Sequence, residues 1–505
     1  MAKSISNKAV KNKPEIKPIG KTVLPKPAFR LDKTNRLPIL VSIIIAIILF
    51  VMQVMQYPHP EMFSDSGSYL TSAVRGVLGY RPIGYSWFIS FFHSISSSLH
   101  FLPIAQFILH ILSALFLVQT VLYVVPVRNN ILRYVFHIAV ISSPWAVQIS
   151  NAVMSDSVFL SFTYIWLASL LWIAFSAKLR NTVIFFVIHL IALYLLIMVR
   201  YIAIIYPVLS CLLIFTTRSR WTSVACTVAF FVVVVLTNNK NDAILRNALG
   251  PNPPKSSFAG WLLGNNASPI LGHHKFDLSK TNDRDIRFVQ EIMTHYPDSI
   301  FSTVNSLNTN FIWSNALAGK EVVRSLMQRD NIGYFLAWFK SGAMVGKWAK
   351  WIIFQKPVDF FKYFLWPNGL LTFKLYSIYE PPLFKLDEDV QKWYNYPISE
   401  YTQLSRYNTH VLSPLVKVLG LIQWLGLLTA LFFVFKNKVY RLNTGQDKIT
   451  VFCLLFILLY FGFHTLASPL INYRYHILAY APVWIIIIFA ADIQLLNRSK
   501  KTDIV

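Results

Sequence analysis

Three carboxylates stand apart in this 505-residue sequence because they are the only ones between Asp32 and Asp242. They are Glu61, Asp65 and Asp156. Each lies at the edge of a long apolar run, and ionisable side chains at membrane depth are costly and generally face a bundle interior or a watery cavity. Three acids on one face therefore suggest a site, although loops between apolar runs are also simply wetter than the runs themselves.

Three arginines accompany these acids. They are Arg81 in YRPIGYSWF, Arg200 in MVRYIAIIYP and Arg474 in INYRYHILAYAP. A guanidinium group suits phosphate and diphosphate oxygens because its donors form a planar fork. The alternatives for any one arginine are snorkelling to lipid headgroups or pairing with an acid. Taken together, the arginines and acids favour a site for an anionic lipid and a hydroxyl-bearing substrate.

The elements that position these residues are expected to be membrane-spanning helices. Hydrophobic side chains make up 55% of the chain and charged ones only 14%, whereas about a quarter is usual in soluble domains. Apolar runs of about 20 residues recur, as an ~30 Å hydrocarbon core requires, so we expect a mainly α polytopic membrane protein. The formal charge of +25 lies in short clusters between the runs, which argues against nucleic acid as a partner.

The apolar runs predict ten spans. They cover residues 37–57, 101–125, 132–148, 157–177, 182–199, 201–217, 222–237, 412–435, 449–467 and 475–493. A cytoplasmic amino terminus places the basic segments VRNNILR, AKLRN, TTRSR, KNKVYR and NRSKK on the cytoplasmic side, and both termini then lie there. The three acids and three arginines fall at the external boundary. The tight turn at Arg200 and the stretch 85–100 are the weakest points of this topology.

The same pattern divides the chain into five regions. Residues 1–36 hold ten Lys or Arg and two acids and are expected to be a disordered cytoplasmic tail near anionic headgroups. The others are a transmembrane catalytic region at 37–237 with a first external loop at 58–100, an external region at 238–410, C-terminal transmembrane helices at 411–495 and a cytoplasmic tail at 496–505.

One stretch of the external region has a membrane character of its own. GYFLAWFKSGAMVGKWAKWIIF mixes Trp, Phe and Lys in the manner of an interfacial amphipathic helix. The alternative is an eleventh span, or a re-entrant pair with the following PVDFFKYFLWPNGLLTF. An extra span would change the predicted topology after it.

Helix capping is a second explanation for two of the acids. Asp65 stands where SDSGSYLTSAVRG begins a short predicted helix, so Ser64 or Asp65 would suit its N-cap, with Tyr69 one turn later on the same face. Asp156 likewise begins a span, and Ser155 competes for that cap. Capping alone would account for either residue.

The order of four motifs resembles the GT-C superfamily of polytopic glycosyltransferases. These motifs are the acid-bearing first loop FSDSGSYL, the following RPIGYSWF, a second external acid in VMSDSVFL and the late RYHILAYAP. The resemblance is to bacterial members similar to protein O-mannosyltransferases and lipid A aminoarabinose transferases. It covers residues 37–240 and 449–495, and no single motif in it is specific.

The resemblance implies a role for each candidate residue. Asp65 would be catalytic, as a general base on the acceptor hydroxyl or as a group that organises it. Asp156 would contact substrate or help to hold a cation, and the three arginines would bind the phosphate of a polyprenyl-phosphate sugar donor. The further substrate-binding candidates are Glu61, Tyr69, Tyr85 and Tyr475.

The sequence leaves it undecided whether the protein uses a divalent cation. Many members have paired acids in the first loop, but here Ser66 follows Asp65 and Glu61 lies four residues upstream. A hard cation would have few protein ligands, although a substrate phosphate could complete a Mg²⁺ shell. No cofactor is therefore certain, and a divalent cation, Mg²⁺ or Mn²⁺, would use Asp65 and Asp156. His273, His274 and His464 lack zinc spacing.

The expected function is transfer of a hexosyl or pentosyl group from the lipid-phosphate donor to a lipopolysaccharide or other envelope glycan, lipid or protein acceptor. The expected location is the external face of a bacterial inner membrane. One alternative is an O-antigen ligase or polymerase, whose catalytic residues are usually Arg and His late in the chain. Another is a secondary transporter or lipid-linked-sugar flippase, for which charged or broken helices near the bilayer midplane would be typical.

Overall fold

The computed structural model describes most of the chain between the two predicted tails. The described residues are 33–57, 59–63, 65–76, 81–254, 257–296, 317–375, 384–385, 387–395, 400–401, 412–468 and 473–502. The predicted disordered tail lies outside them up to residue 32. The predicted carboxyl-terminal tail begins inside the last helix, which continues to Thr502.

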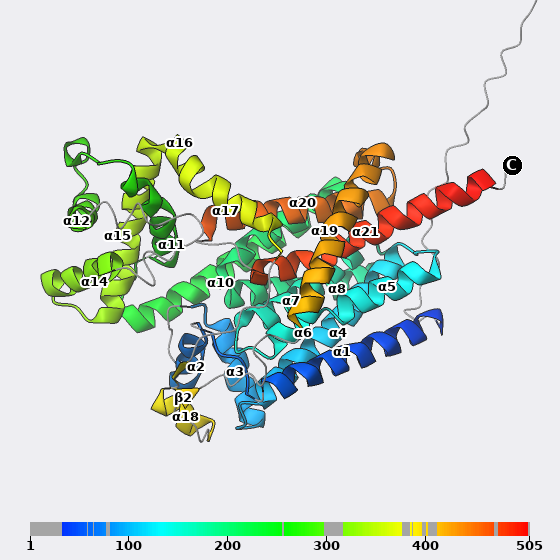
Figure 1. Ribbon diagram of the computed structural model, residues 1–505, viewed down its shortest axis with the longest axis horizontal. Helices are drawn as coiled ribbons and strands as arrows, with labels where there is room; N and C mark the ends of the chain where they lie inside the picture. Colours follow the sequence, from blue (N-terminus) through cyan, green and yellow to red (C-terminus); the bar gives the residue numbers. More distant parts are fainter. Residues whose placement is uncertain are drawn as a thin grey trace, which may run out of the picture.

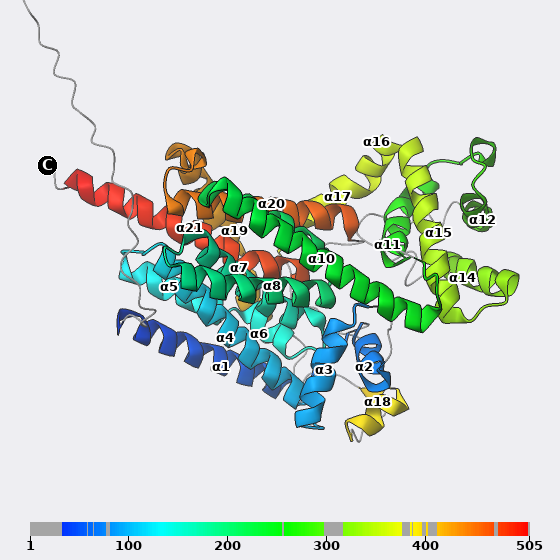
Figure 2. The same cartoon turned by 180° about the vertical axis from the view of Figure 1, so that it is seen from behind.

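Eight helices in the described part of the chain are long and apolar enough to cross a membrane. They are α1 (Arg36–Gln56, preceded by η1, Lys33–Asn35), α4 (Phe101–Val124), α7 (Ser155–Phe175), α8 (Leu179–Val199), α10 (Arg220–Leu249), α19 (Ser413–Lys436, followed by η7, Val439–Arg441), α20 (Gly445–Ala467) and α21 (Tyr473–Thr502). Most of them follow the long axis of the molecule and form one bundle (Figures 1 and 2). The mainly α, polytopic membrane character is therefore confirmed.

Burial distinguishes the centre of this bundle from its rim. In α7 and in α21, 83% of the apolar window is buried within the protein, against 22% in α1 and 28% in α19. The rim helices turn long aliphatic side chains outward, as helices facing lipid do. The first and last thirds of the chain thus share one core, built around α7 and α21.

The other two predicted spans are shorter helices. Residues 132–148 are divided between α5 (Asn130–Ile141) and α6 (Pro144–Ser150). The division follows from the sequence, because Pro144 lacks an N–H and Ser143 caps the new helix. Residues 201–217 form η2 (Tyr201–Ile205) and α9 (Tyr206–Thr217), an apolar pair shorter than the eight long helices. A total of ten spans stays a prediction.

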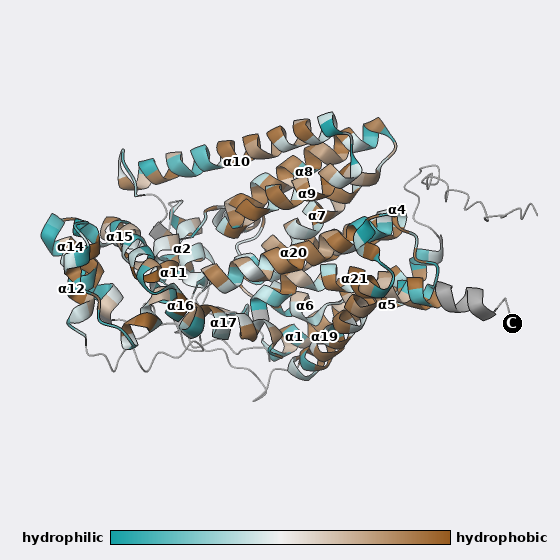
Figure 3. Cartoon of the chain, turned by 90° about the horizontal axis from the view of Figure 1, so that it is seen from above, coloured by the Kyte–Doolittle hydropathy of each residue, from teal (hydrophilic) through white to brown (hydrophobic). Residues whose placement is uncertain are grey.

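One end of the bundle carries most of the remaining helices, and we call it the loop end. Here lie α2 (Ser66–Arg75) and α3 (Gly84–Ile95), which follow α1 in the chain. α10 also continues to this end, 12 residues beyond its predicted limit at 237. That extension is hydrophilic (Figure 3).

A second group of helices, which we call the head unit, has a hydrophobic core of its own at the loop end. Its helices are α11 (Ser257–Ala267), η3 (Ser268–Gly272), η4 (Leu278–Lys280), α12 (Arg284–Thr294), α14 (Leu317–Asp330), α15 (Tyr334–Gln355), α16 (Pro357–Phe360) and η5 (Phe361–Leu365). The chain then returns to the bundle through α17 (Trp366–Leu370) and η6 (Leu371–Phe373), where Asn368 of α17 donates to the Thr465 carbonyl of α20 at 3.1 Å. The predicted interfacial helix is α15, which lies across the bundle axis (Figure 1) and is not among the eight long candidates.

Glycines allow α11 and α15 to cross closely. A Cβ atom at Gly260 would overlap the carbonyl oxygen of Gly342, and one at Gly346 would lie 2.8 Å from the Cα atom of Gly260. Small residues spaced four apart permit such backbone contact between helices. This crossing fixes α11 at the centre of the head unit.

A small antiparallel pair and a short helix complete the described structure. Strands β1 (Phe384–Lys385) and β2 (Glu400–Tyr401) pair, and α18 (Glu388–Trp393) lies between them in the chain. α18 rests on α2 through an ion pair of 2.9 Å between Arg75 and Asp389. His93 of α3 stacks on Trp393 with ring centroids 3.6 Å apart.

Candidate functional site

Backbone hydrogen bonds join the first loop to the connection between α6 and α7. The amide of Glu61 donates to the carbonyl oxygen of Asn151, and the amide of Val153 donates to that of Glu61, both at 2.9 Å. The two segments thereby form a short parallel bridge between Glu61 and Ala152. Segments about 90 residues apart in the chain are held together at the level where α2 and α7 begin.

Side chains strengthen this junction. Ser66 accepts a hydrogen bond from the amide of Phe63 and donates one to the carbonyl of Val153, each 2.8 Å long. The hydroxyl groups of Tyr69 and Ser155 are 2.9 Å apart. The start of α2 is therefore fixed beside the start of α7, which brings Asp65 and Asp156 to one place.

Asp65 directly precedes α2 but its side chain makes no capping hydrogen bond. Its carboxylate instead forms an ion pair with Arg81, which comes just before α3. Arg81 in turn lies 4.8 Å from the centre of the Phe258 ring of α11, a cation–π distance. The head unit thus covers one side of this ion pair, and helix capping does not explain Asp65.

A close contact between α3 and α8 sets the position of Arg81. A Cβ atom at Gly84 would lie 2.5 Å from the carbonyl oxygen of Met198. Only glycine fits at that separation, so the amino-terminal end of α3 sits directly on the carboxyl-terminal end of α8. Arg200 follows α8 by one residue, which places the second arginine near the first.

Asp156 lies in the first turn of α7 and is 5% exposed. The helix amino terminus is a favourable place for a negative charge, and the carboxylate also forms an ion pair with Arg200. Burial by itself lowers the pKa of Arg200, but the negative charge of Asp156 outweighs it and the pKa is raised. Arg200 therefore keeps its charge.

Arg474 connects the two ion pairs. Its Nη1 atom lies 3.9 Å from Oδ2 of Asp65 and 3.9 Å from Oδ2 of Asp156. Five charged residues from four distant parts of the chain therefore form one network. We call it the charged cluster, and its members are Asp65, Arg81, Asp156, Arg200 and Arg474.

The charged cluster is positive and partly open. Three guanidinium groups against two carboxylates leave a net charge of +1. Side-chain exposure is 20% for Asp65 and 19% for Arg474 but only 5% for Asp156. Asp65 is thus the carboxylate that a bound molecule can reach, whereas the buried Asp156 forms ion pairs with Arg200 and Arg474.

Glu61 lies apart from the charged cluster. Its side chain is fully buried, and its carboxylate accepts hydrogen bonds from the amides of Gln53 of α1 and Gln148 of α6, the latter at 2.9 Å. With its backbone in the parallel bridge, Glu61 joins three segments of the bundle. This arrangement fits a structural residue, and its predicted role in substrate binding stays untested.

Tyr85 also stabilises the junction between the first loop and the connection from α6 to α7. Its hydroxyl donates to Oε1 of Gln106 at 2.8 Å, and the amide of Gln106 donates to the carbonyls of Ser150 and Ala152 at 2.9 Å each. The Tyr69 ring meets the Tyr85 ring edge-on at 4.9 Å. Burial raises the pKa of both phenols, so both stay protonated and act through hydrogen bonds.

The last candidate, Tyr475, lies beside a histidine that sequence reasoning set aside. The rings of Tyr475 and His464 are 4.0 Å apart. His464 is buried, its Nδ1 atom is 2.5 Å from the Ser468 hydroxyl, and its Nε2 atom has no hydrogen-bond partner among the described residues. No sequence signal pointed to this pair, because His464 lies alone in the apolar helix α20 and Tyr475 belongs to the next helix, α21.

The donor set does not suit a resident metal ion. Within the described residues, no group of three or more His, Cys, Asp or Glu side chains is placed to hold one. The two carboxylates of the charged cluster face guanidinium groups, which would repel a divalent cation.

Phe258 of α11 and Gln106 of α4 are further residues of this site that the sequence did not indicate. Their relevance follows from contacts with Arg81 and Tyr85, both made across long sequence separations. A comparison with known protein families, with curated proteins and with solved structures found no match for this chain.

Proposed function

We propose that this chain is a membrane glycosyltransferase that moves a sugar from a polyprenyl-phosphate donor to a hydroxyl of an envelope glycan, lipid or protein. The observation that carries the proposal is the contact of Arg474 with both Asp65 and Asp156. It unites a reachable carboxylate with three guanidinium groups at one end of an apolar bundle. Few membrane-embedded arrangements would need both a proton acceptor and such a concentration of phosphate-binding groups.

The reaction would need little more than these groups. Asp65 accepts the proton of the acceptor hydroxyl as its oxygen bonds to the anomeric carbon of the sugar. The bond between that carbon and the phosphate oxygen breaks, and polyprenyl phosphate leaves with the electron pair. Arg81, Arg200 and Arg474 stabilise the negative charge on the departing phosphate, since guanidinium groups bind its oxygens through paired donors.

Asp65 and Asp156 would have different roles in the reaction. Asp65 is the more exposed of the two and is shared between Arg81 and Arg474, so an acceptor can approach it from the opening. Asp156 is buried against Arg200 and orients the guanidinium groups. The head unit, which contacts Arg81 through Phe258, would select the acceptor.

The proposed topology follows from the same assignment. The loop end would face the periplasm of a bacterial inner membrane, and both termini would lie in the cytoplasm. A flippase or secondary transporter is less favoured, because the charged cluster lies at one end of the bundle and not at its midplane.

An O-antigen ligase or polymerase is the second candidate function. His464 is buried beside Tyr475, one residue from Arg474. Catalysis by Arg and His late in the chain would use these residues, without Asp65.

The two functions differ in their dependence on Asp65. The purified protein is reconstituted with a polyprenyl-phosphate sugar and candidate acceptors, and Asp65→Asn is compared with Asp389→Asn. Asp389 is a matched control because it also pairs with an arginine, Arg75, but at an exposed site on α18. We expect transfer to be lost only in Asp65→Asn, whereas its retention there with loss in His464→Gln would favour the ligase.

A further inference from the structure

The chain leaves the head unit through a run of short helical elements that we call the return segment. It consists of α16, the π-helical turn η5, α17 and η6, which follow one another without a break over residues 357–373. Figures 1 and 2 show α16 and α17 running from the head unit back to the bundle. Because α10 carries the chain into the head unit, the return segment is its connection to the bundle at the other end.

One face of the return segment is buried, first in the head unit and then against the bundle. Phe360 and Phe364 belong to the hydrophobic core of the head unit. One turn later, the side-chain amide of Asn368 donates to the carbonyls of Thr465 and Ser468, at 3.1 and 3.0 Å, where α20 ends. Since α20 is one of the eight long apolar helices, the return segment reaches the end of a candidate membrane span.

The opposite face of the return segment is apolar and exposed. Phe361 and Trp366 are five residues apart, and a π-helical turn, with its i→i+5 spacing, keeps such side chains on one face. A helix that is apolar on both faces has no side suited to water. The residues of the exposed face are Val358, Phe361, Trp366, Leu370 and Phe373, which are 74%, 54%, 57%, 49% and 65% exposed.

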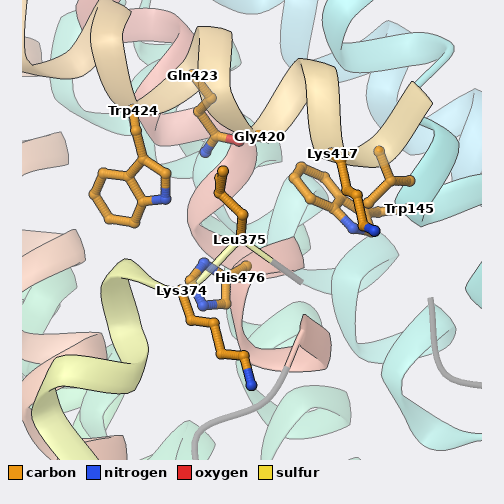
Figure 4. Close-up of a pocket in the computed structure, with 9 residues that line it drawn as sticks. Trp145, Lys374, Leu375, Lys417, Gly420, Gln423, Trp424 and His476 are labelled. Atoms are coloured by element: carbon orange, nitrogen blue, oxygen red, sulfur yellow. The ribbon is translucent and has the colours of Figure 1, made fainter. Parts of the chain in front are cut away.

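The end of the return segment lies beside another long apolar helix. The Phe373 ring is 5.3 Å from the Trp424 ring of α19. After η6 the chain continues along α19, where a Cβ atom at Gly420 would lie 3.5 Å from Leu375 (Figure 4). Leu421 of the same helix is 47% exposed, as expected for a side chain that faces lipid. The exposed face of the return segment therefore ends next to the lipid-facing surface of the bundle.

A lysine accompanies the aromatic residues of this face. Lys362 is exposed and lies four residues before Trp366, with its ammonium group 4.9 Å from the centre of the Tyr363 ring. Lysine together with tryptophan is typical of the membrane interface, where the long lysine side chain extends its charge to the headgroups. α15, which the sequence suggested for the interface, instead buries Trp338 and Trp348 in the core of the head unit.

We propose that α17 and η6 are seated in the bilayer leaflet at the loop end, with Trp366, Leu370 and Phe373 among the acyl chains and Lys362 at the headgroups. The partner of this face is the bilayer that surrounds the bundle. α17 and η6 together rise only about 13 Å, so they can enter one leaflet of an ~30 Å hydrocarbon core but cannot cross it. The return segment would thus anchor the head unit to the membrane, independently of the proposed transfer reaction.

Spin labels can report the surroundings of this face in the full-length protein. The three cysteines, Cys211, Cys226 and Cys453, are replaced by alanine, and thermal unfolding shows whether this background is folded. One cysteine is then introduced as Leu370→Cys or Phe373→Cys, labelled, and reconstituted into vesicles of phosphatidylethanolamine and phosphatidylglycerol. The measurement is the accessibility of each label to oxygen, which concentrates in acyl chains, and to a nickel chelate, which stays in water.

Two positions serve as references for lipid and water. Leu421→Cys lies on the lipid-facing side of α19, and Arg324→Cys on α14 replaces a side chain that is 61% exposed. We expect the ratio of oxygen to nickel accessibility at Leu370→Cys and Phe373→Cys to match Leu421→Cys and to exceed Arg324→Cys several-fold. A ratio like that of Arg324→Cys at either position would overturn the proposal. Exclusion of both reagents would also overturn it, because protein would then cover this face.

Tryptophan fluorescence gives a second test that leaves the cysteines in place. Trp366→Phe and the control Trp348→Phe each remove one indole, and the difference from wild type gives the emission of that indole. Trp348 is 0% exposed in the core of the head unit. In vesicles of phosphatidylcholine brominated on its acyl chains, we expect the emission of Trp366 to be quenched and that of Trp348 to be unchanged. Equal quenching of the two, or no quenching of Trp366, would contradict the proposal.

Discussion

Gly84 lies against Met198 so closely that a Cβ atom would come within 2.5 Å of the Met198 carbonyl oxygen. The Met198 carbonyl belongs to the backbone, and a Cβ atom is fixed to the backbone of residue 84, so the clash could be relieved only by displacing α3 or α8. This contact fixes the distance between Arg81, which precedes α3, and Arg200, which follows α8.

Substitution of Gly84 should therefore damage the site through geometry alone. Overpacking typically costs about 1–3 kcal/mol, and we expect Gly84→Ala to lower the thermal unfolding temperature and the transfer rate together. Gly462→Ala is the control, because a Cβ atom there meets nothing within 4 Å. An unchanged unfolding temperature in Gly84→Ala would show that the two helices do not meet in this way.

Arg474 should be replaceable only by a residue with the same fork of donors. It faces two carboxylates at 3.9 Å, and Lys offers a point charge where Arg offers a plane. Removal of a group that stabilises developing charge typically costs about 10²–10³ in rate. We expect a fall of this order in kcat for Arg474→Gln and a smaller one for Arg474→Lys.

The measurement is steady-state transfer with the reconstituted protein, alongside thermal unfolding. A fall in kcat with unchanged unfolding would support a role at the reacting phosphate. The same kcat in Arg474→Gln and wild type would remove Arg474 from the mechanism.

Glu61 should act on stability more than on catalysis. Its buried carboxylate accepts from the amides of two glutamines on different helices, and an alanine would leave those buried donors without this acceptor. The typical cost is about 1–3 kcal/mol for each unsatisfied group. We expect Glu61→Ala to unfold at a lower temperature, with the remaining folded protein close to wild type in KM. A large increase in KM with normal stability would instead support the predicted role in substrate binding.

Activity is expected to survive removal of divalent cations. The described residues offer no cluster of three metal-ligating side chains, and arginines flank both carboxylates of the charged cluster. Transfer is measured after dialysis against EDTA and again after addition of Mg²⁺ or Mn²⁺. Loss of activity that either ion restores would establish metal dependence, with the substrate phosphate completing the ligand shell.

Acid should weaken the junction between α1 and α4. Burial lowers the pKa of His59 below its usual 6.5, and the nearby His100 lowers it further. Because the unfolded chain then binds the proton more readily, the stabilising contribution of neutral His59 is complete above about pH 6.5 and is lost as the pH falls towards the folded-state pKa. Thermal unfolding measured from pH 7.5 to 5 should therefore decline less in His59→Gln than in wild type.

The sequence by itself determined the class of protein and the identity of the charged residues. Apolar runs of span length can satisfy their backbone only as helices in a membrane, so composition and periodicity were enough. The cost of burying charge likewise made Asp65, Asp156 and the three arginines conspicuous against an apolar background. The proline at residue 144 carried a local signal for the break between α5 and α6, which a span prediction based on hydrophobicity passed over.

Tertiary structure decided which of these charges meet. The bridge between Glu61 and Ala152 and the contact between Gly84 and Met198 bring Asp65 to Asp156 and Arg81 to Arg200, over separations that no local pattern encodes. The same packing buries Glu61 among glutamines and places His464 beside Tyr475. The sequence shows that these residues are charged and that a lone charge in an apolar bundle would be unfavourable. Which opposite charge each one pairs with depends on how distant segments pack.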